Sequence, residues 1–250
     1  MTTTAPIALI TGGSRGLGKN AALALAQQGT DIILTYQQNA AAAQAVISEI
    51  EWLGRKAVAL PLDVADSSSF AAFADTVRQQ LQQYWQRDSF NYLLNNAGIG
   101  INAPFTDTTE QQFDQLMRIH VKGPYFLTQQ LLPLINDGGR IINISSGLAR
   151  FSLPGYAAYA SMKGAMEVLT RYQAKELGGR GISVNILAPG AIETDFGGGA
   201  AALVALLELP LVADELGAVI AVAFTVLSVD TSVSLPCKRP ARTRSATVTP

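Results

Sequence analysis

The chain has 250 residues with a formal net charge of −1, and 48% of its residues are hydrophobic. A hydrophobic content this high excludes disorder over most of the length, and the length suits one large α/β domain. The near-neutral charge argues against a protein that binds nucleic acid or coats anionic membranes, because such proteins carry a basic surplus. The single cysteine, Cys237, excludes an internal disulfide and a cysteine-rich zinc site. We therefore predict no metal site and a reducing, cytoplasmic setting.

Short apolar runs alternate with longer helical patterns along the chain. We predict six strands, at Ile7–Ile10, Ile32–Leu34, Ala57–Leu62, Tyr92–Leu94, Ile141–Ile144 and Val184–Leu187. Strands that are apolar on both faces are typical of a sheet that helices cover on both sides. Repeated strand–helix–strand units require parallel strands and right-handed crossovers. The predicted fold is therefore a single Rossmann-type, doubly wound parallel α/β sheet with helices on both faces.

A helix with one apolar face is predicted between the third and fourth strands. Its apolar residues recur at a spacing of three or four, at Phe70, Phe73, Val77, Leu81 and Tyr84. We expect Asp66 or Ser67 to cap its beginning, since a side-chain oxygen there can accept from unpaired backbone N–H groups. Glycines are expected at helix ends, at Gly29, Gly54 and Gly138-Gly139.

The last fifth of the chain has a different character. Asp214–Leu227 is predicted to be an amphipathic helix, and the charge-free stretch Leu216–Val229 is too short to cross a membrane. Residues 231–250 contain three prolines and four basic residues. We therefore predict one domain over residues 1–230 and a poorly ordered tail over residues 231–250. A nucleic-acid-binding arm is the alternative for this tail, but a solvated tail is favoured.

A glycine-rich loop follows the first predicted strand directly. Gly12, Gly16 and Gly18 give the spacing G-x-x-x-G-x-G, which differs from the common dinucleotide fingerprint G-x-G-x-x-G. Glycines let a backbone approach a pyrophosphate, and the start of the next helix offers unpaired N–H groups and the positive end of a dipole. We therefore predict a dinucleotide phosphate site, with an ordinary tight turn as the alternative.

The end of the second strand predicts which dinucleotide binds. An acidic residue at this place binds the ribose 2′-OH and repels a 2′-phosphate. Tyr36 and then Gln37 stand there instead, so the repelling acid is missing. Arg15 in the glycine-rich loop can pair with a phosphate, although it can also be a solvated loop charge. We therefore favour NADP(H), with NAD(H) as the alternative.

Tyr159 and Lys163 lie four residues apart in a predicted helix, and Ser146 stands 13 residues before the tyrosine. Residues four apart share one helical face. Carbonyl reduction needs a hydride on carbon and a proton on oxygen, and a free tyrosine with a pKa of about 10 is a sluggish acid. A neighbouring ammonium stabilises tyrosinate, so Lys163 is expected to lower the pKa of Tyr159.

Together these motifs resemble the short-chain dehydrogenase/reductase family over roughly residues 5–196. The chain looks similar to the 3-oxoacyl-carrier-protein-reductase-like branch of that family. The resemblance implies hydride transfer between NADP(H) and a small-molecule carbonyl or alcohol substrate. It also implies that Tyr159 is the acid or base, that Lys163 also holds the nicotinamide ribose, and that Ser146 binds the substrate oxygen. Ser145 is then strand-end structure.

The resemblance further implies a set of cofactor-binding residues. Besides Tyr159 and Lys163, these are Gly12, Ser14, Arg15, Gly16, Leu17, Gly18, Tyr36, Asp63, Val64, Asn96, Ala97, Gly98, Pro189, Gly190, Ile192 and Thr194. Asp63 is expected at the adenine amino group, and the segment from Pro189 at the nicotinamide carboxamide. Asn95 is expected to tie strands together. In relatives the helix with the tyrosine packs against another subunit, so a homodimer or homotetramer is expected.

Two departures from the family pattern bear on activity. His120, the only histidine, stands where relatives have a catalytic Asn. Either it holds the water that the Asn would hold, or it is a packed helix residue beside a weakened proton relay. The segment after Thr194 is short, and no final strand with paired glycines is predicted.

These departures leave alternatives open. One is a catalytically weak or inactive nucleotide-binding or regulatory protein on the same fold, and another is a scaffold that acts through self-association. Several residues either line an apolar substrate pocket or belong to the core, namely Leu148, Phe151, Leu153, Tyr156 and Phe196.

Overall fold

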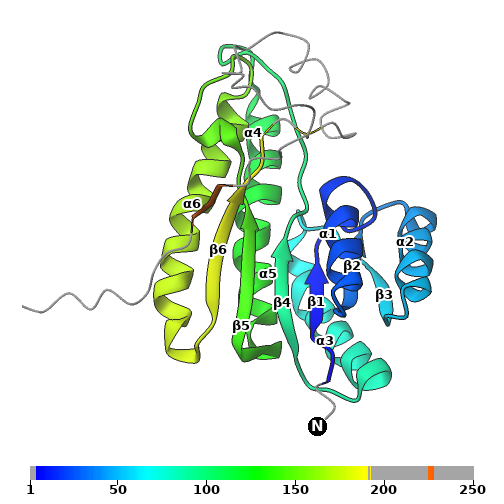
Figure 1. The fold of residues 1–250 in the computed structure, drawn as a ribbon. Coiled ribbons are helices and arrows are strands. Elements are labelled where there is room, and N and C mark those ends of the chain that lie inside the picture. Colours follow the sequence, from blue (N-terminus) through cyan, green and yellow to red (C-terminus); the bar gives the residue numbers. More distant parts are fainter. Residues whose placement is uncertain (1–3, 191, 193–224, 228–250) are drawn as a thin grey trace, which may run out of the picture.

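The computed structural model describes residues 4–190, residue 192 and residues 225–227 of the chain. They form one sheet with the strand order β3-β2-β1-β4-β5-β6-β7 (Figure 1). The strands are β1 (Ile7–Ile10), β2 (Asp31–Tyr36), β3 (Ala57–Pro61), β4 (Phe90–Asn95), β5 (Ile135–Ile144), β6 (Ser183–Ala188) and β7 (Thr225–Leu227). Strands β1 to β6 pair in parallel, which confirms the predicted doubly wound α/β fold.

Helices cover both faces of this sheet. They are α1 (Gly16–Gln27), α2 (Ala40–Trp52), α3 (Phe70–Gln80), α4 (Glu110–Met117), α5 (Gly123–Leu131) and α6 (Ala157–Leu177). Successive strand side chains point to opposite faces. On β1, Ala8 and Ile10 pack with residues of α1 and α2, whereas Ile7 and Leu9 pack in the cluster that contains residues of α3, α5 and α6. The core is therefore two apolar layers, one on each side of the sheet.

The order of the strands positions the site. The chain builds β1 to β3 outward in one direction and then returns to place β4 on the other side of β1. In Figure 1 the blue half of the chain, with α1 and α2, lies at one end of the sheet, and the green half, with α4 and α5, lies toward the other. Loops that leave β1 and β4 diverge at this switch point, and open α/β sheets bind ligands there, at the carboxyl ends of the strands.

The predicted helix between the third and fourth strands is confirmed as α3. A short 3-10 turn, Ser67–Ser69, precedes it, and Asp66 caps this turn by accepting from Ser68 N at 3.0 Å. After α3 the chain continues through a π-helical turn to Trp85. The expected cap at Asp66 therefore acts one turn earlier than the helix itself.

The predicted glycine positions are right at two places and wrong at the third. Gly29 and Gly54 follow α1 and α2 with φ values of 89° and 74°, in the left-handed region that favours glycine. The pair Gly138-Gly139 lies within β5 and not at a helix end. The pairing of β5 with β4 shifts register in this part of the two strands. A glycine marks such an irregularity in a strand as readily as it marks a helix end.

The C-terminal prediction is wrong where the structure describes it. Thr225–Leu227 was expected to end a helix, but these residues form β7, which pairs antiparallel with β6. A sheet edge offers unpaired N–H and C=O groups, and a short run with β-branched residues can pair with them. Residues 214–224 and the tail predicted over 231–250 lie outside the described residues.

A π-helical turn that contains His120 joins two helices. Thr109 and Gln112 form a capping box at the start of α4, and a π-helical turn, Arg118–Lys122, joins α4 to α5. Gly123 lies against the backbone of Val64, where any Cβ would overlap the Val64 carbonyl oxygen. Within the described ranges no helix is long and apolar enough to cross a membrane.

Candidate active site

Hydrogen bonds fix the glycine-rich loop between β1 and α1 to the ends of β2 and β4. Gly12 N donates to Thr35 Oγ1 at 3.2 Å, and Asn96 Nδ2 donates to the carbonyl oxygens of Thr11 and Gly12 at 2.8 and 3.2 Å. A Cβ on Gly18 would lie 2.5 Å from Asn96 Nδ2 and would overlap the Gly12 carbonyl oxygen. Only glycine fits at this position, because the helix start lies directly against the loop.

The start of α1 fits a bound phosphate. Gly12 and Gly16 adopt φ values of 66° and 54°, and the first turn of α1 carries no acidic residue. Arg15 is the N-cap residue, and its side chain makes no capping hydrogen bond to the helix. The first N–H groups of α1 therefore remain available to an anion, and the helix dipole favours negative charge there.

Two threonines outside the predicted set of site residues support this loop. Thr11 is buried, and its hydroxyl accepts from Asn96 N at 2.9 Å and from Ala97 N at 3.0 Å. Thr35 is the acceptor for Gly12 N. A polar residue at the end of an otherwise apolar strand was the available signal for both, because a buried hydroxyl needs a partner.

The residues predicted around the adenosine lie at the same edge of the sheet. Tyr36 ends β2 and is half-buried, and Arg15 is exposed. Asp63 follows β3, is exposed, and accepts from Ala65 N at 2.8 Å. Val64 is half-buried beside Gly123. Ser14 and Leu17 are half-buried in the glycine-rich loop.

Tyr159 and Lys163 project from α6 and are both buried, with 7% and 4% of their surface exposed. Lys163 Nζ donates to Ile144 O at 2.8 Å and lies 5.5 Å from the centroid of the Tyr159 ring. Ser146 follows β5, and its Oγ accepts from Leu148 N at 3.2 Å. Its hydroxyl also forms a hydrogen bond with Tyr159. The predicted Ser, Tyr and Lys are thus brought together at the carboxyl end of β5.

The neighbouring asparagine and serine have the structural roles expected of them. Asn95 Nδ2 donates to Asn143 Oδ1 at 2.8 Å, which links β4 to β5. Ser145 Oγ donates to Lys163 O at 3.3 Å and to Glu167 Oε1 at 3.2 Å, which fixes α6 to the end of β5.

The pKa of Tyr159 is shifted upward in this structure, opposite to the direction expected from a neighbouring ammonium. Burial raises the pKa of Tyr159 to about 12, a hydrogen bond from Ser146 acts in the opposite direction, and the nearby Tyr156 raises it further. Burial also lowers the pKa of Lys163 to about 7. The ammonium that was expected to stabilise tyrosinate is therefore itself destabilised, and desolvation of the phenolate dominates.

His120 lies beside this group. Its ring meets the Tyr159 ring edge-on, with centroids 5.2 Å apart. Burial lowers the pKa of His120 to about 3, the positive charge of Lys163 lowers it as well, and the hydrogen bond to Ile99 opposes both. His120 Nε2 is 2.8 Å from Ile99 O, closer than the 3.3 Å to Ile99 N. We therefore assign the proton to Nε2, so Nδ1 carries the lone pair.

This lone pair has no donor in the described part of the chain, although His120 Nδ1 is buried. Gly98 makes room for the ring, since a Cβ there would lie 2.7 Å from His120 Cε1. A buried, unpaired acceptor is uncommon in native structures and marks a position that packing alone does not explain.

The predicted nicotinamide segment starts at the end of β6. Pro189 is buried, and its carbonyl oxygen accepts from Gly147 N at 3.0 Å, which joins this segment to the loop that follows Ser146. Gly190 is exposed and Ile192 is half-buried. Thr194 lies outside the described residues, as does Phe196.

The wall around Tyr159 is apolar. Leu116 of α4 and Met162 of α6 are buried against it, and the partly buried residues that complete the cluster are Ile99, Ile101, Val121, Leu148, Tyr156 and Ala158. Leu148 and Tyr156 pack against this cluster, whereas Phe151 is 52% exposed. This cluster places apolar side chains beside Tyr159.

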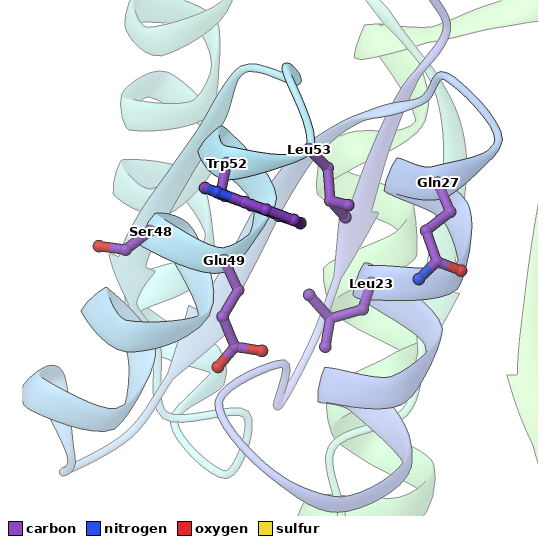
Figure 2. Close-up of a pocket in the computed structure, with 6 residues that line it drawn as sticks. All are labelled: Leu23, Gln27, Ser48, Glu49, Trp52 and Leu53. Carbon is purple, nitrogen blue, oxygen red and sulfur yellow. The ribbon is translucent and has the colours of Figure 1, made fainter.

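Surface hollows also occur away from this site. One of about 420 Å³ lies between α1 and α2, beside Trp52 (Figure 2). The carboxylate that lines it, Glu49, is paired with Lys19 at 2.8 Å. It is on the face of the sheet opposite α6 and therefore remote from Tyr159. No cluster of metal-ligating side chains occurs within residues 4–190, 192 and 225–227.

Comparison with known proteins identifies the family. The model of the family described as short chain dehydrogenase matches residues 6–202. The chain belongs to the short-chain dehydrogenase family. A curated relative, the tetrahydroxynaphthalene reductase PfmaG of Pestalotiopsis fici, is 36% identical over 190 residues, which cover 76% of this chain and 66% of the relative. The chain thus spans just under two thirds of that reductase.

Solved structures of other oxidoreductases show the same fold. The promiscuous reductase LugOII, which catalyses keto-reduction at C1 during lugdunomycin biosynthesis, is 35% identical with a TM-score of 0.76, over 82% of this chain and 80% of its own. A short-chain dehydrogenase from Burkholderia cenocepacia J2315 in complex with NADP is 33% identical with a TM-score of 0.71, over 82% and 90%. As a member of this family, the chain is an NAD(P)-dependent oxidoreductase.

Proposed function

We propose that this short-chain dehydrogenase is an NADP(H)-dependent ketoreductase with Tyr159 as its acid. The observation that carries the proposal is the convergence of Ser146, Tyr159 and Lys163 at the carboxyl end of β5. An apolar wall surrounds them, and the glycine-rich loop opens at the same edge of the sheet.

The protonation state of Tyr159 is compatible with carbonyl reduction. Because burial raises its pKa to about 12, the phenol keeps its proton at neutral pH. Tyr159 donates this proton to the carbonyl oxygen, and Ser146 donates a hydrogen bond to the same oxygen as negative charge develops on it. NADPH, when bound, supplies the hydride to the carbonyl carbon. Lys163 holds the ribose and places a charge beside Tyr159 when it is protonated.

The cofactor preference is assigned to Arg15. Its guanidinium is exposed at the start of α1, and Tyr36 at the end of β2 offers no carboxylate against a 2′-phosphate. The NADP complex of the Burkholderia relative also supports this preference. In Arg15→Ala the KM for NADPH should rise roughly tenfold or more, since a charged hydrogen bond contributes about 1.5–3 kcal/mol. The KM for NADH should not change.

The matched control is Lys19→Ala, because Lys19 is also a cation of α1 but is paired with Glu49. The control should leave both values unchanged. An equal loss for NADPH and NADH in Arg15→Ala would contradict the assignment.

The substrate class that we propose is an oxygenated aromatic ketone. The names of the relatives indicate a tetrahydroxynaphthalene and a keto group reduced during lugdunomycin biosynthesis. The apolar cluster around Tyr159 suits fused rings. The alternative is a 3-oxoacyl thioester, as in the reductase branch that the sequence resembles.

The first test is the loss of NADPH absorbance with 2-tetralone, hydroxylated tetralones, simple aldehydes and 3-oxoacyl thioesters. Turnover of the tetralones that disappears in Tyr159→Phe supports the proposal. Turnover that survives this substitution contradicts the assignment of the acid. NADPH-dependent thermal stabilisation without turnover of any substrate favours the alternative, a catalytically inactive nucleotide-binding protein.

We further propose that His120 takes part in the proton relay in place of the family Asn. The unpaired, buried Nδ1 beside Tyr159 supports this role, whereas a merely packed histidine needs no free acceptor. His120→Asn should retain turnover, and His120→Phe should lose most of it across the pH range. Unchanged turnover in His120→Phe would favour the packing alternative.

We also propose that the protein forms a homodimer or homotetramer through α5 and α6. Four large apolar side chains are exposed on these helices, namely Tyr125, Phe126, Val168 and Tyr172. A hollow of about 460 Å³ separates the two helices at this surface. Val168→Glu should shift the mass measured by light scattering to that of a monomer. Trp52→Glu, a change at an 87% exposed residue on α2, should leave the mass unchanged.

A further inference from the structure

Tyr156 stands one helical turn before Tyr159, at the N-cap of α6. Residues three apart lie on the same face of a helix. The two rings are 6.4 Å apart between centroids and meet at an interplanar angle of 73°. Tyr156 is only partly buried and packs in the apolar cluster with Leu116 and Met162. Its ring is therefore part of the wall that faces the reacting group.

The hydroxyl of Tyr156 is available to a ligand. Among the described residues it has no hydrogen-bond partner, and it is not among the buried polar atoms that lack one. Because this hydroxyl is unpaired and not buried, a ligand can form a hydrogen bond with it. Its proximity is also one of the causes that raise the pKa of Tyr159, so the two phenols lie close enough to interact.

The apolar cluster around Tyr159 offers no polar group besides the two tyrosines. Apart from the two tyrosines, the side chains that form the cluster are Leu116, Met162, Ile99, Ile101, Val121, Leu148 and Ala158, all of them apolar. A substrate oxygen other than the one held by Tyr159 and Ser146 would lose its hydrogen bonds to water against such a wall. An unpaired polar group in an apolar site costs binding energy. A phenolic hydroxyl can both donate to a carbonyl and accept from a hydroxyl.

We propose that Tyr156 is a specificity-determining residue whose hydroxyl binds a second oxygen substituent of the substrate, a few bonds from the carbonyl that is reduced. The inference rests on the proposed ketoreductase function and goes beyond it. It makes ring-hydroxylated ketones better substrates than the same ketones without the hydroxyl. Tyr156 takes no part in proton transfer, so its contribution is to substrate affinity.

The experiment compares 2-tetralone with its monohydroxylated derivatives in the wild-type protein and in Tyr156→Phe. The wild type should prefer at least one hydroxylated derivative by roughly three- to tenfold in kcat/KM, the value of one net hydrogen bond. In Tyr156→Phe this preference should disappear, because the KM for the hydroxylated derivatives should rise more than the KM for 2-tetralone, which has no second oxygen to lose a hydrogen bond. Tyr172→Phe is the matched control, since Tyr172 is on the same helix but 64% exposed, and it should keep the preference.

The outcomes separate the two proposals. If the wild type reduces no tetralone, the proposed aromatic-ketone function fails and the inference fails with it. If it reduces them without preference, or if Tyr156→Phe keeps the preference, the inference is overturned and the reductase function stands. A fall in kcat for 2-tetralone in Tyr156→Phe would also overturn it, because that result assigns the hydroxyl to the chemistry. Thermal melts of both variants with NADPH show whether the fold and the cofactor site are intact.

Discussion

Replacing His120 should change how the stability of the protein depends on acid. Burial, reinforced by Lys163, holds the pKa of His120 at about 3, whereas the ordinary value is 6.5. As the pH falls below 6.5, His120 binds a proton in the unfolded chain but stays neutral in the folded chain. The free energy of unfolding therefore falls from pH 6.5 down to about 3. Between pH 7 and pH 4 we expect this residue alone to remove about 3 kcal/mol.

In His120→Phe this contribution should vanish. The substitution also removes the hydrogen bond to Ile99 O and the unpaired Nδ1 acceptor, and these two effects change stability in opposite directions. They are the same at every pH, so they cancel when two pH values are compared. Urea denaturation of wild type and variant at pH 7 and pH 4 therefore isolates the titration, because all other groups titrate in both proteins.

His120→Asn is the control for size and polarity, since it cannot titrate but keeps a donor and an acceptor. Both variants should lose about 3 kcal/mol less than the wild type on acidification. If wild type and variants lose stability in parallel between pH 7 and pH 4, the histidine is protonated without penalty. The buried, neutral imidazole that underlies the reasoning would then be refuted.

Three further predictions follow from other parts of the structure. Gly18→Ala should abolish NADPH-dependent thermal stabilisation, because its Cβ would overlap the Gly12 carbonyl oxygen; an unchanged shift in Tm would show that the loop can move aside. Asp31→Ala should lower the free energy of unfolding in urea by about 3–5 kcal/mol, because the buried carboxylate accepts from Arg55, Lys56 N and Trp85, and a loss below about 1 kcal/mol would contradict this. For wild type, kcat/KM should fall as the pH rises above about 7, where Lys163 loses its charge, and a profile that stays flat to pH 9 would contradict the role of the ammonium.

Much of the fold could be read from local patterns. The six parallel strands were visible as apolar runs, since a strand covered on both faces must be apolar along its length. The spacing of Gly12, Gly16 and Gly18 indicated a loop that permits close approach, and the structure shows that a side chain at Gly18 has no room. The pair Gly138-Gly139 was wrongly predicted at a helix end, because a glycine is also common at an irregularity within a strand.

The edge of the sheet was less predictable. Thr225–Leu227 was assigned to a helix from its apolar pattern, yet it pairs with β6. A short apolar run has no strong preference of its own, and the unpaired backbone of an edge strand decides its conformation. The supporting roles of Thr11 and Thr35 were also invisible, since they depend on which strand ends are neighbours.

The sequence by itself determined the family, the doubly wound sheet and the positions of Ser146, Tyr159 and Lys163, because periodicity, glycine spacing and helical register are local properties of a chain. Only the tertiary structure decided how these groups are protonated. Desolvation depends on what packs around a group, and packing brings together residues distant in sequence. Packing therefore raises the pKa of Tyr159 and lowers the pKa of Lys163. It also keeps His120 neutral, with an unpaired acceptor at Nδ1.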